Sequence, residues 1–186
     1  IGSRAVPSFD LLTLSLDYLK ELCRSSHEAV HLAIPDGPEI IYLFKEVTSE
    51  NVIRIASQTG ARNYMYYTGL GKALLATMSE STVKELWDQS EITAYTPTTI
   101  TSFPELLEDL TLIRKRGYAI DNEEHEAGIV CIADVVRDAD NKAVAAISIS
   151  TLANRMDNAF LSKNVPQLKK TAAKISGILG YVPPES

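Results

Sequence analysis

The chain has 186 residues, of which 45% are hydrophobic and 23% charged, a composition typical of one globular domain with a sizeable core. Its formal net charge of -6 makes the molecule repel a phosphate backbone, which argues against nucleic acid as a direct partner. No apolar stretch approaches the roughly 20 residues that span a bilayer, and the first residues lack a secretory pattern. We therefore expect a cytoplasmic protein without a membrane segment.

The two cysteines, Cys23 and Cys131, lie far apart and have no short Cys-x-x-Cys spacing. This arrangement indicates neither a disulfide framework nor a zinc ribbon. A reducing compartment is the simplest environment for them. We expect no metal and no cofactor.

Hydrophobic spacing predicts the elements of the first third of the chain. A helical period predicts a helix over residues 9–22. Short apolar runs then predict three strands of a meander, at residues 29–34, 40–44 and 51–56, with a Pro-Asp-Gly-Pro turn between the first two.

Three helices are predicted next. Residues 69–76 combine small and long-chain residues that favour helix, and residues 79–87 form a second, separately capped helix. The third has the clearest start signal, a capping box of Ser102 and Glu105, and it ends at Gly117 after three basic residues.

The last third predicts a hairpin and a closing helix. Strands at residues 128–136 and 142–150 flank a turn rich in Asp and Asn, and residues 165–179 carry one apolar stripe that starts beside Asn164. The first and last helices should pack together, because each has an apolar stripe that needs cover. We therefore expect one α+β domain over residues 1–186, with a central, mainly antiparallel sheet flanked by helices.

Four blocks of sequence carry a resemblance: GLGKALLA (69–76), LIRKRGYAIDNEE (112–124), GIVCIA (128–133) and AAISIS (145–150). In this order and spacing they resemble the effector-binding domain of IclR-type bacterial transcriptional regulators, in particular those of sugar-acid catabolism that respond to ketodeoxygluconate. The resemblance implies a GAF-like fold and a homodimer or homotetramer. It also implies a winged helix-turn-helix domain upstream, absent from this chain, through which alone DNA would be bound.

The resemblance implies a site for a small carboxylate effector. The carboxylate would rest on the backbone N–H groups of Gly69 and Leu70, because a helix N-terminus binds anions without Lys or Arg. An ionised aspartate only accepts hydrogen bonds, which favours a hydroxy or keto acid as the effector. The implied polar contacts are Asp121, Cys131, Ser148 and Ser150.

Each of these residues also has an ordinary structural role. Gly69 suits a plain helix start or close packing. Strand alternation puts Ser148 and Ser150 on one otherwise apolar face, yet serines on sheets more often face solvent or bond to backbone. Asp121 can bond the backbone that follows a strand. These alternatives stay open from sequence.

Cys131 supports the main alternative function, a GAF-like thiol enzyme. His125 and Asp121 lie nearby in sequence, and Cys, His and Asp can build a nucleophile with its base. A metal site from Cys131, His125 and Glu123 lacks the usual short ligand pairs. A cysteine between apolar strand neighbours is more often a buried hydrophobe. We therefore expect a ligand cradle with no catalytic residue, and no enzyme.

Three residues depart from the family pattern. Tyr66 and Tyr67 stand where many relatives have a histidine and a small residue, and Leu70 replaces an often smaller residue. These changes bear on the volume of the pocket and on the identity of the ligand. A further possibility is a dimerisation domain with an empty core.

Overall fold

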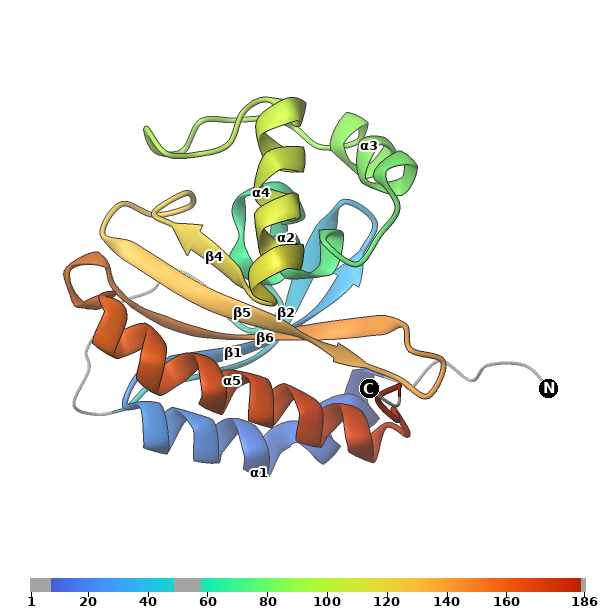
Figure 1. Ribbon diagram of the computed structural model, residues 1–186, viewed down its shortest axis with the longest axis vertical. Helices are drawn as coiled ribbons and strands as arrows, with labels where there is room; N and C mark the ends of the chain where they lie inside the picture. Colours follow the sequence, from blue (N-terminus) through green and yellow to red (C-terminus); the bar gives the residue numbers. More distant parts are fainter. Residues whose placement is uncertain (1–7, 49–57, 185–186) are drawn as a thin grey trace.

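The computed structural model describes residues 8–48 and 58–184, which form an α+β fold around one six-stranded sheet (Figure 1). The strand order is β3-β2-β1-β6-β5-β4, and all neighbours are antiparallel. The expected fold class is confirmed, whereas the strand expected at residues 51–56 lies outside the described residues. The strands are β1 (Ala29–Asp36), β2 (Glu39–Glu46), β3 (Arg62–Tyr64), β4 (Ala119–Asn122), β5 (Ile129–Arg137) and β6 (Ala143–Leu152).

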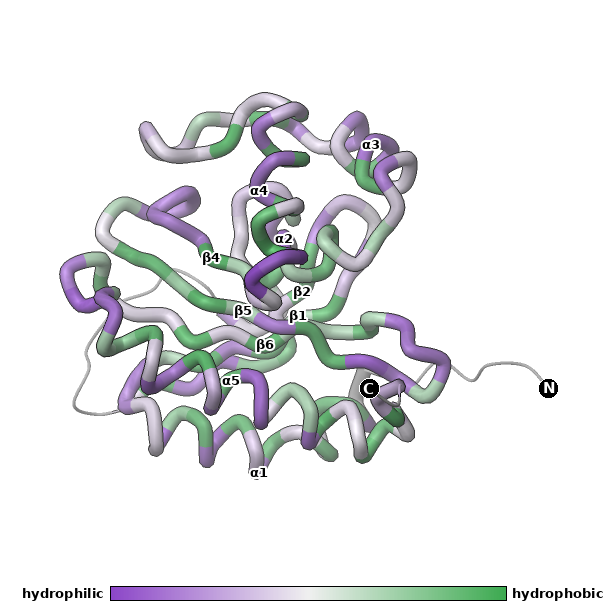
Figure 2. Tube along the Cα trace, in the orientation of Figure 1, coloured by the Kyte–Doolittle hydropathy of each residue, from purple (hydrophilic) through white to green (hydrophobic). Residues whose placement is uncertain are grey.

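Helices cover both faces of the sheet. On one face α1 and α5 lie side by side, as their apolar stripes predicted, and on the other lie α2, α3 and α4 (Figure 1). In Figure 2 hydrophobic residues follow β5 and β6, while hydrophobic and hydrophilic residues alternate along α1 and α5. The helices are α1 (Ser8–Ser26), α2 (Gly69–Leu75), α3 (Glu80–Asp88), α4 (Phe103–Arg116) and α5 (Asn158–Ile178).

Strand β6 separates the two cores by simple alternation. Ala145, Ile147 and Ile149 belong to the core under α1 and α5, whereas Ala146 belongs to the core under α2 and α4. From Ala145 to Ile149 the odd-numbered side chains therefore face the two long helices, whereas Ala143, opposite a register shift in β5, belongs to the other core. The even-numbered ones, including both serines of the predicted site, face α2.

The ends of α5 and α1 differ from the sequence prediction. Helix α5 begins at Asn158, seven residues before the expected start, because the Asp157 carboxylate accepts from the Phe160 N–H at 2.7 Å and caps the helix. Pro166 lies inside the helix, where it lacks the N–H that would bond to the carbonyl of the exposed Ser162. Helix α1 runs to Ser26, four residues beyond the predicted end.

Helix α4 and the hairpin follow their sequence signals. The Ser102 hydroxyl accepts from the Glu105 N–H, and Gly117 ends the helix with a left-handed φ of 80°. Strands β5 and β6 pair as the expected hairpin. The short strand β4, which carries Asp121, was missed. None of the helices within the described ranges is long and apolar enough to cross a membrane.

Candidate functional site

A small cavity of about 40 Å³, within about 450 Å³ of empty space that includes open solvent, lies between the sheet and the first turn of α2. We call it the α2 pocket. The structure brings all six residues of the predicted site to its wall: Gly69, Leu70, Asp121, Cys131, Ser148 and Ser150. It adds residues that the sequence did not single out as ligand contacts, among them His31, Tyr42, Thr68, His125 and Glu126.

The sheet register explains why residues from four strands meet in this pocket. Asp121 of β4 is paired with Cys131 of β5, which is paired with Ser150 of β6. Two residues away along β6, Ser148 is paired with His31 of β1. Paired residues on antiparallel strands point to the same face, so these two rows form one polar floor.

The first turn of α2 borders the pocket. Thr68 is the N-cap, and its hydroxyl accepts from the Gly71 N–H at 3.0 Å. Gly69 and Leu70 precede the first intrahelical bond, so the helix itself supplies no acceptor for their N–H groups. Both residues line the α2 pocket.

Glycine at position 69 also has a packing role. A Cβ atom there would lie 2.6 Å from the Cys131 sulfur and 3.5 Å from the Asp121 Cβ. Asp121 and Cys131 therefore lie directly beside the N-terminus of α2. Gly69 therefore permits close packing and also lines the pocket.

Asp121 is buried and has an unusual charge balance. Burial, followed by the charge of Glu124, raises the pKa of Asp121 to about 7, while the Glu124 N–H and the Lys72 charge act in the opposite direction. The Glu124 N–H donates to Asp121 Oδ1 at 2.8 Å. At neutral pH the carboxyl is divided between its neutral and ionised forms. The sequence-based prediction treated Asp121 as ionised, and burial disfavours that state.

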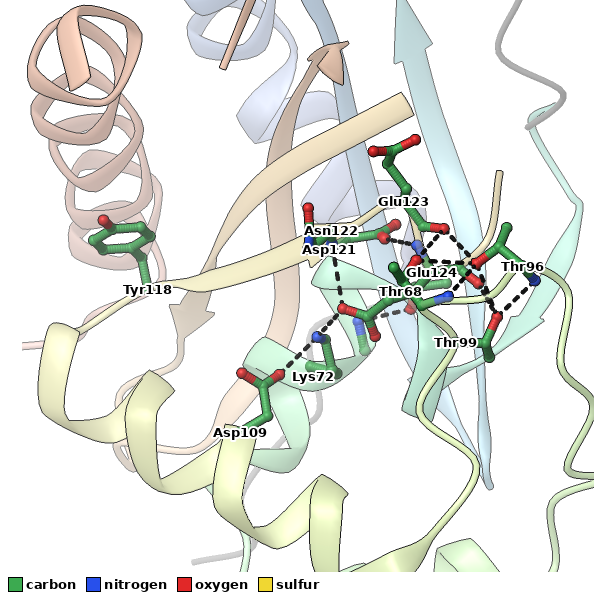
Figure 3. Close-up of polar contacts among 12 residues, drawn as sticks. Thr68, Lys72, Thr96, Thr99, Asp109, Tyr118, Asp121, Asn122, Glu123 and Glu124 are labelled. Atoms are coloured by element: carbon green, nitrogen blue, oxygen red, sulfur yellow. Dashed lines mark hydrogen bonds and ion pairs between the residues drawn. The ribbon is translucent and has the colours of Figure 1, made fainter. Parts of the chain in front are cut away.

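A buried ion cluster lies directly behind Asp121 (Figure 3). Lys72 is only 1% exposed, and its Nζ lies 2.6 Å from Asp109 Oδ2 and 2.5 Å from Glu124 Oε1. This cluster was not predicted from sequence. The feature that could have predicted it is a lysine in an otherwise apolar helix, because a buried ammonium requires carboxylate partners.

Threonines from the segment between α3 and α4 fasten the turn that follows β4 (Figure 3). Thr96 Oγ1 donates to the Glu123 carbonyl at 2.6 Å, and Thr99 Oγ1 donates to the Glu124 carbonyl at 2.6 Å. Glu123 has a left-handed φ of 58°, so these bonds hold a turn that a non-glycine residue rarely adopts. The turn after β4 is thus a fixed part of the wall of the α2 pocket.

The two tyrosines that depart from the family pattern lie behind this wall. Tyr67 stacks on His125 with ring centroids 5.0 Å apart. The Tyr66 hydroxyl donates to the Glu91 and Thr93 carbonyls and accepts from the Thr93 N–H. Both tyrosines support neighbouring segments, whereas Leu70, the third departure, lines the pocket itself.

His31 contributes a neutral imidazole to the floor. It is only 2% exposed, and burial lowers the pKa of His31 to about 3. Its Nδ1 lies 3.4 Å from the Ser148 hydroxyl, and its ring meets Tyr42 edge-on. Local sequence does not identify this partner of His31, because Ser148 is 117 residues away.

Cys131 lies among the residues that the thiol-enzyme alternative requires, but its chemistry is unsuitable. Burial, aided by the charge of Asp121, raises the pKa of Cys131 well above its usual value. The thiol thus stays protonated, whereas a nucleophilic cysteine needs a thiolate. Burial also lowers the pKa of His125, which stacks on Tyr67. Within the described residues no group of three His, Cys, Asp or Glu side chains is placed to hold a metal ion.

A second and larger cavity, of about 250 Å³ within about 560 Å³ of empty space that includes open solvent, lies behind α2. It is bounded by alanines of α2, β4 and β5 and by two arginines at its rim. Arg114 donates to the Ala76 and Met78 carbonyls, and Arg137 donates to the Asn141 carbonyl. Because these guanidinium groups already bond to backbone, the α2 pocket has the more suitable set of polar groups for a ligand.

The comparisons with known proteins agree with this fold. Residues 3–177 match the family described as "Bacterial transcriptional regulator IclR C-terminal". The chain belongs to the IclR family. As an IclR-family chain it aligns with complete regulators and shares their C-terminal fold.

Two relatives and one solved structure illustrate the IclR match. The chain is 34% identical over 180 residues to the HTH-type transcriptional regulator XynR of Escherichia coli K12, covering 97% of this chain and 71% of XynR. It is 37% identical over 181 residues to KdgR of the same organism, covering 97% of this chain and 68% of KdgR. The crystal structure of Thermotoga maritima IclR matches with a TM-score of 0.88 at 36% identity, covering 93% of this chain and 70% of that one.

Membership of the IclR family defines the role of the chain at a coarse level. It is the effector-binding C-terminal domain of a transcriptional regulator. The relatives are named as regulators, which supports a regulatory role over the thiol-enzyme alternative. The ligand and the residues that hold it are matters for proposal.

Proposed function

We propose that this domain binds a small carboxylate metabolite in the α2 pocket, a 2-hydroxy or 2-keto acid of the kind derived from sugars. Its binding alters how the regulator engages DNA through a separate DNA-binding domain. The observation that carries the proposal is that backbone donors and Asp121 lie at the same end of one polar pocket.

The anionic end of the ligand belongs at the first turn of α2. Among the described residues that line the pocket, none is a lysine or arginine, so a carboxylate would depend on the N–H groups of Gly69 and Leu70 and on the helix dipole. Asp121 lies next to Gly69, where a ligand carboxylate would disfavour its ionisation. Neutral Asp121 can donate a hydrogen bond to an oxygen on the carbon beside that carboxylate. This favours a 2-hydroxy or 2-keto acid.

The rest of the ligand would lie over the neutral polar floor. Ser148 and Ser150 offer hydroxyls that donate or accept, and His31 is an uncharged imidazole. The Tyr42 hydroxyl accepts from Asn63 Nδ2 at 3.3 Å, which leaves its own proton for another acceptor. Such a floor suits the hydroxyl groups of a sugar-derived chain.

Calorimetric titration with 2-ketogluconate, gluconate and uncharged gluconamide tests the proposal. At least one acid should bind, and gluconamide should bind at least about tenfold more weakly than gluconate, because a hydrogen bond to a charged group contributes roughly 1.5–3 kcal/mol. Affinity should fall as pH rises through about 7, since ionised Asp121 repels the ligand carboxylate.

Asp121→Asn is the informative variant for this titration. It keeps an oxygen to accept the Glu124 N–H and remains uncharged, so the affinity should lose its pH dependence. The exposed Asp88→Asn on α3 is the control and should bind like wild type. Equal affinity for gluconate and gluconamide, or the same pH dependence in Asp121→Asn, would contradict the proposal.

We further propose that the regulator works as a homodimer or homotetramer, as the family resemblance implies. Ligand binding can change DNA affinity only if it distinguishes two states of the assembly. Sedimentation of the chain with and without the bound acid tests this, and a monomer under both conditions would contradict it.

A further inference from the structure

Lys72 places a charge where an apolar side chain would be expected. It occupies the fourth position of α2, the helix whose first turn lines the pocket, and it is almost fully buried. Its two carboxylate partners come from different elements, Asp109 from α4 and Glu124 from the turn after β4. One side chain thus joins three segments that are distant in sequence (Figure 3).

Glu124 connects this ion cluster to the pocket. Its Oε1 also accepts from the Asn122 N–H at 3.2 Å, and its own N–H donates to Asp121 Oδ1 at 2.8 Å. Its carbonyl accepts from the Thr99 hydroxyl. Side chain, N–H and carbonyl of one residue thereby fix the turn against α2, the pocket carboxyl and the segment before α4.

We propose that Lys72 is a positioning residue for the effector pocket: through Glu124 it holds the turn after β4, and hence Asp121, at a fixed place beside the first turn of α2. The inference rests on the proposed function in taking Asp121 as a ligand contact. Its structural part, the placement of the turn, does not depend on any ligand.

Stability alone does not account for the cluster. Desolvation of buried charges offsets much of their attraction, and apolar residues of similar volume often stabilise a protein as well or better. Leucine or methionine would continue the apolar pattern of α2 and pack on α4. What such residues lack is a directional link to the turn that carries Asp121.

The cluster also sets the charge environment of Asp121. The negative charge of Glu124 raises the pKa of Asp121, and the positive charge of Lys72 lowers it. Replacing Glu124 with glutamine removes the repulsion but keeps the acceptor shape, so Asp121 should titrate at lower pH than in wild type. The other titratable groups that line the pocket around Asp121 are His125 and Glu126 of its own loop, Cys131 of β5, Tyr42 of β2 and His31 of β1.

The decisive variant is the double substitution Lys72→Met/Glu124→Gln. It leaves no fully buried charge unpaired, because Asp109 is 20% exposed and lies 3.6 Å from Arg116. The matched control is Lys84→Met/Asp88→Asn, which removes an exposed ion pair on α3. The measurements are urea unfolding, amide hydrogen exchange at Asn122 and Glu124, and titration with 2-ketogluconate and gluconate.

The double variant should unfold at a urea midpoint close to that of the control. The Asn122 and Glu124 amides should nevertheless exchange about tenfold faster or more, and affinity for whichever acid the wild type binds should fall about tenfold or more. Wild-type exchange at both amides together with wild-type affinity would overturn the inference. If the wild type binds neither acid, the proposed function fails, and exchange alone decides the role of Lys72.

The single variant Glu124→Gln provides a second test in case the double variant does not fold. Carboxyl NMR should then show Asp121 titrating below its wild-type pKa of about 7, an effect that depends on the charge of Glu124 and not on general packing. An unchanged titration of Asp121 would overturn the electrostatic link between the cluster and the pocket.

Discussion

At the scale of single residues, the floor of the α2 pocket contains His31, whose charged form would be buried away from water. His31 is buried between β6 and Tyr42, and burial lowers its pKa to about 3. In the unfolded chain the same imidazole would titrate near its ordinary value of 6.5. Between these two pH values the unfolded state binds a proton that the native state does not.

His31 should therefore make the protein sensitive to acid. A lowered native pKa means that its contribution is fully present above about pH 6.5 and is lost as pH falls toward 3, by up to about 1.4 kcal/mol per pH unit. From pH 7 to pH 5, urea unfolding of wild type should lose up to about 2 kcal/mol more than that of His31→Gln. Equal losses in the two proteins would show that His31 is not buried as a neutral group.

Sequence and family resemblance predicted residues that line the pocket, but not the residues that support them. Asp121, Cys131, Ser148 and Ser150 were predicted and do line one pocket. Lys72 was not predicted, because its partners lie 37 and 52 residues away. The charge of Asp121 was misjudged for the same reason, since burial and neighbouring charges cannot be inferred from local sequence.

At the scale of elements, the position of α2 depends on close contacts that its glycines permit. A Cβ atom at Gly71 would overlap the backbone of Met65, so the helix packs directly on the preceding 3-10 turn, Met65–Tyr67. This contact sets the height of α2 above the sheet. The position of the pocket donors thus depends on a residue that does not itself line the pocket.

Two glycine-to-alanine substitutions separate this packing role from helix propensity. Gly71→Ala should destabilise the protein by about 1–3 kcal/mol, because backbone atoms cannot move aside as a side chain could. Gly177→Ala, in α5 with open space around it, should stabilise by roughly 0.5–1 kcal/mol through helix propensity. Thermal or urea unfolding measures both. A Gly71→Ala variant as stable as wild type would contradict the packing argument.

The elements that sequence located well have strong local signals, and those that it missed have none. Helix α4 has a capping serine and a terminal glycine, and both function as predicted. Strand β4 has four residues, two of them polar, and becomes a strand only by pairing with β5. The start of α5 was misplaced because Asn164 and Pro166 suggest a helix start, whereas the capping Asp157 lies further upstream.

At the scale of the whole molecule, the two faces of the sheet have different roles. One face packs on α1 and α5, and the other holds the α2 pocket, whose wall is fastened by the ion cluster and the threonine bonds. The pocket wall includes the loop after β4, which the segment before α4 holds through hydrogen bonds. A ligand that moves this wall can therefore also move helices on the outer surface, as a sensing domain requires.

A crystal structure of the chain with the acid that titration identifies, for example 2-ketogluconate, tests the central claim most directly. We predict that the carboxylate oxygens lie about 2.7–3.2 Å from the backbone nitrogens of Gly69 and Leu70, and that the 2-oxygen lies beside Asp121. A carboxylate turned toward Ser148 and His31, or an acid bound in the second cavity behind α2, would contradict it.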